Sequence, residues 1–182
     1  MVFRTSASLA AILLLFTAIA QAEGESSDDP FVGTYDVVGV TTNVRSGDTR
    51  KIAGHVVLSK SGEEYRAASQ LATDYPTAGG AVHADVVGTG EARLEGGMLK
   101  GTARTQLVLQ KVPGVDTNFA FVPREVGPRI ASTWTARLDK DRTLVVELSN
   151  RPAKGEQYSA TTTKLRGTRV AMPQHGAPRP QP

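Results

Sequence analysis

The side chains with the broadest chemical range in this chain are its three histidines, His55, His83 and His175. An imidazole can serve as a general base or as a metal ligand near neutral pH. None of the three stands in the His-x-His or His-Glu-x-x-His spacing that local metal sites use. His55 and His83 fall on different expected strands, so only folding could bring them together. The spacing therefore predicts no metal site, and two ordinary polar strand residues are the simpler interpretation.

Signatures of enzyme chemistry are missing from the rest of the sequence as well. The chain has no cysteine, which removes thiol nucleophiles and cysteine-ligated metals. It has no Gly-x-Ser-x-Gly elbow and no phosphate-binding Walker loop. Gly88-Thr89-Gly90 begins like a dinucleotide fingerprint, but Arg93 stands where the third glycine belongs. Adjacent Glu63 and Glu64 lie in an expected solvated turn. We therefore predict a protein without catalytic residues and without a cofactor.

Four aromatic side chains on expected strands are the candidate ligand-binding residues: Tyr35, Tyr65, Trp134 and Tyr158. They would line a hollow interior, and filling a solid core is the alternative use of the same side chains. Aromatic residues make up only 5% of the chain, and no basic stripe is interleaved with them. Because single-stranded nucleic acids bind on aromatic platforms beside basic grooves, we expect no nucleic-acid partner. The net charge of +3 indicates no other polyanionic partner.

The elements that would position these side chains are β-strands, because the middle of the chain alternates apolar and polar residues. In the clearest segment, Leu99, Ala103 and Leu107 fall on one face, and Lys100 and Arg104 fall on the other. A strand with one apolar face is typical of an antiparallel sheet that covers a core. The same alternation predicts eight strands, at 31–42, 50–59, 64–71, 81–94, 98–110, 132–138, 143–149 and 157–166.

Short turns join most of the expected strands. Residues 60–63, 95–97 and 139–142 are hairpin-like connections in which glycine, lysine or aspartate is frequent. Strands joined mainly by hairpins favour an all-β fold with a single antiparallel up-and-down barrel of about eight strands. A β-sandwich is the alternative. A barrel of this size encloses either packed side chains or one small ligand.

Two longer connections, 72–80 and 111–131, interrupt this pattern. The second contains apolar residues among three prolines. A lid over a barrel mouth and a further short strand at 118–122 are both compatible with such a segment. Gly88 and Gly90 interrupt the fourth expected strand and predict a bulge or a sharp bend there.

The first expected strand also carries a family resemblance. Its opening, Phe31-Val32-Gly33-Thr34-Tyr35, resembles the Gly-x-Trp signature that begins the first strand of lipocalin-like (calycin-like) barrels. Tyrosine replaces the tryptophan of that signature at Tyr35. The resemblance implies a secreted eight-stranded barrel that holds a small apolar ligand. It also implies that Tyr35 plugs the closed end of the barrel.

The N-terminal residues 1–22 have the three-part order of a secretory signal peptide. Arg4 supplies a basic start, residues 9–19 form an apolar run, and Ala20-Gln21-Ala22 supplies small residues for cleavage. The apolar run is shorter than the roughly 20 residues that cross a bilayer. We therefore predict that the protein is secreted or periplasmic. An acidic linker at 23–30, a barrel domain at 31–167 and a proline-rich disordered tail at 168–182 would follow.

These features lead to three functional hypotheses. The first is an exported, non-enzymatic β-barrel that binds a small apolar ligand in its interior. The second is a structural or protein-interaction module of the cell envelope with no ligand. The third is an outer-membrane barrel, which the low aromatic content disfavours because such barrels carry aromatic girdles.

The predicted cleavage after Ala22 can be checked on exported protein. N-terminal sequencing of the mature chain is expected to read from Glu23 onward. A chain that begins at Met1, or at another residue, would contradict the assignment.

Overall fold

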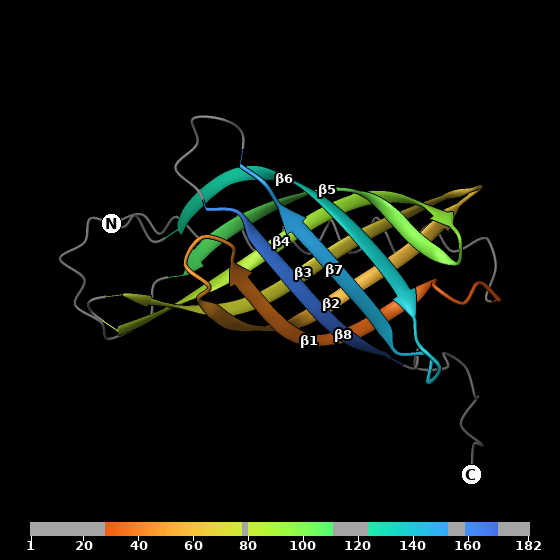
Figure 1. Cartoon of the computed structure of the whole chain (residues 1–182), viewed down its shortest axis with the longest axis horizontal. Helices are drawn as coiled ribbons and strands as arrows, with labels where there is room; N and C mark the ends of the chain where they lie inside the picture. Colours follow the sequence, from red (N-terminus) through yellow and green to blue (C-terminus); the bar gives the residue numbers. More distant parts are fainter. Residues whose placement is uncertain (1–27, 78–79, 111–123, 153–158, 171–182) are drawn as a thin grey trace, which may run out of the picture.

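The computed structural model describes residues 28–77, 80–110, 124–152 and 159–170, and these form eight β-strands. The strands are β1 (Gly33–Asn43), β2 (Thr49–Ser61), β3 (Glu64–Thr77), β4 (Gly80–Glu95), β5 (Met98–Gln110), β6 (Arg124–Leu138), β7 (Leu144–Asn150) and β8 (Thr161–Arg169). Each strand pairs antiparallel with the next, and β1 also pairs with β8, so the sheet closes into a barrel. In Figure 1 the first strand, in orange, lies beside the last, in blue. The predicted all-β, up-and-down barrel is confirmed, and the sandwich alternative is set aside.

Three of the connections are the tight hairpins that the sequence predicts. Between β4 and β5, Gly96 and Gly97 both have positive φ angles, 59° and 79°. A two-residue turn of this kind needs positive φ at both positions, which glycine adopts without a steric cost. Gly62, with φ of 60°, serves the turn between β2 and β3. Between β6 and β7, the Asp139 carboxylate accepts a hydrogen bond from the Thr143 amide at 3.0 Å.

Two strands, β3 and β6, are much longer than the sequence predicts. β3 continues to Thr77, which pairs with Gly80 of β4, so most of the expected connection at 72–80 is strand. β6 begins at Arg124, so residues 124–131 of the expected connection at 111–131 are strand as well. Pairing with a neighbouring strand has overridden the local proline and glycine signals. The segment at 118–122, and with it the lid hypothesis, lies outside the described residues.

The predicted bulge at Gly88 and Gly90 is wrong. β4 pairs with β5 through both glycines in continuous register. The register shift of this sheet lies instead between Gln106 and Val108, where β5 pairs with β6. Gly90 instead leaves room for a side chain in the interior of the barrel.

Residues alternate between the inside and the outside of the barrel along each strand. In β1, Tyr35 and Val37 are each 1% exposed, whereas Val38 is 65% exposed. In β5, Leu99 is fully buried and Lys100 is exposed, as the sequence predicts. The inward side chains form one continuous hydrophobic core.

The two ends of the barrel differ in their connections. β1 begins at one end, which also holds the β2–β3, β4–β5 and β6–β7 hairpins. We call this the closed end. The turn between β1 and β2 lies at the opposite end, which we call the mouth. The strand ends that border residues 78–79, 111–123 and 153–158 also lie at the mouth.

The alternation in β1 predicts opposite responses at two adjacent valines. Val37→Asp would bury an unpaired carboxylate among apolar side chains, and we expect it to lower the free energy of unfolding by several kcal/mol or to prevent folding. Val38→Asp, the matched control on the outer face, is expected to change it by less than about 0.5 kcal/mol. Urea unfolding of both variants measures this, and equal losses would contradict the register of β1.

Candidate ligand-binding site

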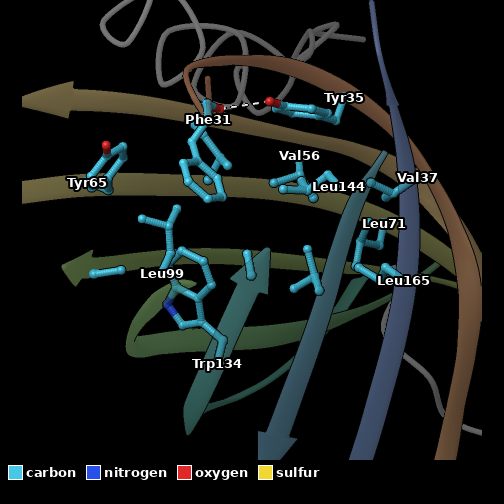
Figure 2. Packing of buried hydrophobic residues seen from close by; sticks show 14 of the residues in the cluster. Phe31, Tyr35, Val37, Val56, Tyr65, Leu71, Leu99, Trp134, Leu144 and Leu165 are labelled. Atoms are coloured by element: carbon cyan, nitrogen blue, oxygen red, sulfur yellow. Dashed lines mark hydrogen bonds between the residues drawn. The ribbon is translucent and has the colours of Figure 1, made fainter. Parts of the chain in front are cut away.

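The closed end of the barrel is filled by residues that precede β1 and by side chains from β1 and β3. The Tyr35 hydroxyl donates a hydrogen bond to the Phe31 carbonyl at 2.9 Å, as Figure 2 shows. The Phe31 ring meets the Tyr65 ring edge to face, with centroids 6.0 Å apart. Both tyrosines are at most 2% exposed. Phe31, Tyr35 and Tyr65 thus form a plug at this end.

A buried carboxylate fastens this plug to β2 and β3. The Asp29 side chain is only 8% exposed and accepts hydrogen bonds from the Tyr65 hydroxyl at 2.6 Å and the Lys60 ammonium at 3.0 Å. The Phe31 amide donates a third at 2.9 Å. Burial of the carboxylate would by itself raise the pKa of Asp29, but the bonds from Tyr65, Lys60 and Phe31 outweigh it. The pKa of Asp29 is therefore lowered from its ordinary value of 3.8.

Between the plug and the mouth, the barrel encloses a cavity of about 390 Å³. Most of its deeper lining is apolar and comes from inward positions of β2 to β8. The large apolar side chains of this lining are Ile52, Val56, Leu58, Leu71, Val86, Leu107, Ile130, Trp134, Val146, Leu148 and Leu165. A space of this kind can bury the apolar surface of a small molecule.

Trp134 lies at the deep part of this cavity and is 4% exposed. Figure 2 shows its indole within the buried cluster, pointing inward from the strand wall. The indole nitrogen donates a hydrogen bond to the Thr102 carbonyl at 3.2 Å, which satisfies its polar atom. A Cβ atom at Gly90 would lie 2.9 Å from that nitrogen, closer than side chains tolerate. Gly90 therefore makes room for the indole. The sequence analysis interpreted this glycine as a bulge or bend and did not predict this role.

Polar side chains run across one side of the cavity lining. Their hydroxyl and amide groups bond to one another across neighbouring strands, from the middle of β5 and β6 to the mouth ends of β7, β8 and β1. We call this set the hydroxyl girdle; its members are Thr41, Thr105, Ser132, Asn150, Thr161 and Thr163. Two of the bonds are Asn150 Nδ2 to Thr161 Oγ1, at 3.0 Å, and Thr163 Oγ1 to Thr41 Oγ1, at 2.9 Å. Among the described residues that line the cavity, Arg50 carries the single charge.

The four aromatic candidates fall in different places. Trp134 lines the cavity, whereas Tyr35 and Tyr65 lie in the plug and are not among the lining residues described. Tyr158 lies outside the described residues. The sequence analysis missed Arg50, because a charged residue on a strand is ordinarily assigned to the outer face. The alternation of β2, in which Arg50 shares the parity of the buried residues of that strand, is the signal that could have found it.

His55 and His83 lie away from this cavity, on the outer face. His55 Nδ1 lies 2.7 Å from Asp36 Oδ1, and His83 Nδ1 lies 3.0 Å from Asp74 Oδ1. The two pairs lie on different parts of the sheet, because His55 is on β2, His83 is on β4, and β3 lies between these strands. Over the described ranges, three or more His, Cys, Asp or Glu residues nowhere gather in a way that could hold a metal ion. His175 lies outside those ranges.

No family model, no curated protein and no solved structure matches this chain. Fold and site together define its class as a closed, eight-stranded, antiparallel up-and-down barrel with one plugged end and an interior cavity. Within the described ranges, the structure contains no helix that is long and apolar enough to cross a membrane.

The Asp29 cluster predicts a pH-dependent contribution to stability. We expect Asp29→Asn to lower the free energy of unfolding at neutral pH by about 1–3 kcal/mol, because Tyr65 and Lys60 lose an ionised acceptor. Since the pKa of Asp29 is lowered in the folded state, this contribution is complete above the ordinary value of 3.8. It is lost as the pH falls through the lower folded-state pKa. Urea unfolding at several pH values should show that the difference in free energy of unfolding between Asp29→Asn and the unsubstituted protein becomes smaller in acid.

Asp141→Asn is the matched control for this comparison, because Asp141 lies exposed in the β6–β7 turn. That variant should stay within about 0.5 kcal/mol of the unsubstituted protein at neutral pH. A gap for Asp29→Asn that is the same at neutral and acid pH would contradict the role assigned to the ionised carboxylate.

Proposed function

We propose that this chain is an exported, non-enzymatic barrel protein that binds one small, largely apolar molecule in its interior. The observation that carries the proposal is the cavity of about 390 Å³ between plug and mouth. Ligand sites in proteins commonly enclose roughly 300–1,000 Å³ and are lined mainly by apolar side chains with a few polar groups. The deeper lining of this cavity, with its aliphatic side chains and Trp134, has that character.

The size of the inward residues supports a preformed site. Small residues occupy inward positions of β3, β4 and β5 that line the cavity, among them Ala67, Gly88 and Ala103. The plug holds the opposite end of the core in place through buried hydrogen bonds. A ligand would therefore enter a space that exists before binding, and binding would gain about 25 cal/mol for each Å² of apolar surface buried.

Two further observations support the lipocalin-like and non-enzymatic parts of the proposal. Tyr35 packs at the closed end, which is the place that the resemblance of the first strand implies for it. The described lining of the cavity contains no histidine and no carboxylate, the groups that most often transfer protons in active sites. Export is supported by the signal-peptide features of residues 1–22.

The outer face bears on the alternative hypotheses. Outward positions on several strands carry exposed charged side chains, including Lys51, Arg66, Glu91, Arg104 and Lys164. A membrane-spanning barrel would instead present an apolar band to lipid, so we favour a barrel whose outer face meets water.

An exposed valine pair favours the interaction module as a second candidate. Val38 and Val40 lie on the outer face of β1 and are 65% and 41% exposed. Apolar side chains that stay exposed in this way are a feature of protein-binding surfaces. This candidate would use the outside of the barrel and would leave the cavity without a function.

Trp134 is the only tryptophan of the chain, so its fluorescence can report on the cavity. We expect a panel of small apolar molecules to contain members that shift this emission in a saturable way. Val86→Phe should weaken their binding at least about tenfold, because the larger ring would occupy the cavity that Val86 lines. Val38→Phe, the same change on the outer face, should leave binding unchanged.

Native mass spectrometry of protein purified from its own compartment is the complementary measurement. A retained molecule that the Val86→Phe variant loses would support the proposal. If no molecule is retained and none of the panel shifts the Trp134 emission, the ligand-binding proposal is wrong and the interaction module replaces it.

A further inference from the structure

One hydroxyl of the cavity lining is without a hydrogen-bond partner. Ser69 lies in the middle of β3 and lines the cavity. Of the described hydroxyl side chains that point inward from the strands and line the cavity, it alone forms no hydrogen bond in the structure. Every described side-chain nitrogen or oxygen that is fully buried has a partner, so the Ser69 hydroxyl is open to the cavity.

The surroundings of this hydroxyl are apolar. Its partner residue on β2 is Val56, and the adjacent inward residues on β3 are Ala67 and Leu71. Its partner residue on β4 is Gly88, where an added Cβ atom would lie 2.8 Å from Ser69 Oγ. Gly88 therefore leaves bare the part of the wall over which the hydroxyl extends. The Ser69 hydroxyl is an isolated polar group in an apolar part of the lining.

The hydroxyl girdle does not supply a partner for Ser69. The girdle residue paired with Gly88 is Thr105, and its methyl carbon Cγ2 would lie 3.2 Å from a Cβ atom at Gly88. The Thr105 hydroxyl lies instead near β6, 3.4 Å from Ser132 Oγ and 3.5 Å from the Ile130 carbonyl oxygen. Thr105 thus presents its methyl group on the side of Ser69 and its hydroxyl on the other side.

We propose that the ligand of this cavity is a largely apolar molecule with one neutral oxygen, a hydroxyl or a carbonyl, which forms a hydrogen bond with Ser69. This inference rests on the proposed function, and it specifies the class of ligand and the residue that selects it.

The cost of leaving a hydroxyl without a partner separates this class from the alternatives. A ligand with no polar atom would keep water from Ser69 and return no hydrogen bond, which is unfavourable. An ionised group at this place would lose its hydration among apolar side chains such as Val56 and Leu71, with only a neutral hydroxyl beside it. A neutral oxygen costs less to remove from water, and it accepts a hydrogen bond from the serine hydroxyl.

Trp134 is placed to report on this contact. A Cβ atom at Gly90 would lie 2.9 Å from its indole nitrogen. Gly88, which pairs with Ser69, is two residues away on the same strand, about 6.6 Å at about 3.3 Å per residue. A molecule bonded to Ser69 therefore lies close to the indole.

Pairs of compounds that share one apolar skeleton and differ by a hydroxyl or a methyl group test the inference. The skeletons are those that the apolar panel shows to bind, and 1-adamantanol with 1-methyladamantane is the first pair. We expect Ser69→Ala to weaken binding of the alcohol about tenfold and to leave binding of the methyl compound unchanged, followed by Trp134 fluorescence and calorimetry. The hydration of each free compound is the same for both proteins and cancels from this comparison.

Ser59→Ala is the matched control, since Ser59 lies on the outer face of β2, and it should change neither affinity. Binding of the methyl compound by Ser69→Ala also shows that this variant is folded. Should it bind neither compound, Ser69→Thr and Ser69→Val provide a second pair of variants, which are similar in size and differ by a hydroxyl. The alcohol should then bind more tightly to Ser69→Thr than to Ser69→Val.

The outcomes separate this inference from the proposed function. Alcohol binding that Ser69→Ala leaves unchanged, or weakens no more than binding of the methyl compound, would overturn the inference and leave the proposed function standing. Binding of methyl compounds but of no alcohol by the unsubstituted protein would do the same. If no compound of the panel bound, the proposed function itself would fall.

Discussion

The pairing of β1 with β8 is the constraint on which the rest of this structure depends. It closes the sheet, so that one face of every strand turns toward a single enclosed space and every strand pairs with a neighbour on both sides over part of its length. The chain has no cysteine that could fasten the barrel, and closure therefore rests on ladder hydrogen bonds and on the packing of inward side chains. Once the sheet is closed, the two-residue period decides which side chains enter the interior.

The size of the inward side chains then divides this interior into two parts. Large residues such as Tyr35, Tyr65 and Leu99 meet at the closed end and fill it. In the middle of the barrel, inward positions such as Ala103 and Gly88 are small, and these residues line the cavity. The same closed sheet thus supports a packed core at one end and a cavity beyond it.

Alternation in the sequence was sufficient to predict the barrel. In β5, for example, every second residue from Leu99 to Leu107 is apolar or small, and these residues form the inward face. The full lengths of β3 and β6 were not predictable, since the residues that extend them gain their hydrogen bonds from neighbouring strands. Gly90 was misread for a related reason. A glycine in a strand signals either a bulge or room for another side chain, and here that side chain is Trp134, which is distant in the sequence. Tyr35 and Tyr65 lie in the plug and apart from Trp134. The contact between Asp29 and Tyr65 that helps to form the plug joins residues distant in the sequence, so the sequence did not reveal this separation.

Hydrogen bonding has opposite consequences at the two ends of the barrel. At the closed end, the Asp29 carboxylate holds three donors, one of them a backbone amide, and breaking this arrangement would leave a buried charge short of partners. At the mouth, the girdle consists largely of hydroxyls, which rotate and can act as donor or acceptor. A hydroxyl such as Thr161 can therefore exchange one hydrogen-bond partner for another at small cost. The closed end is accordingly fixed by a buried charge and its partners, whereas the hydroxyls of the girdle can change their hydrogen-bond partners by rotation.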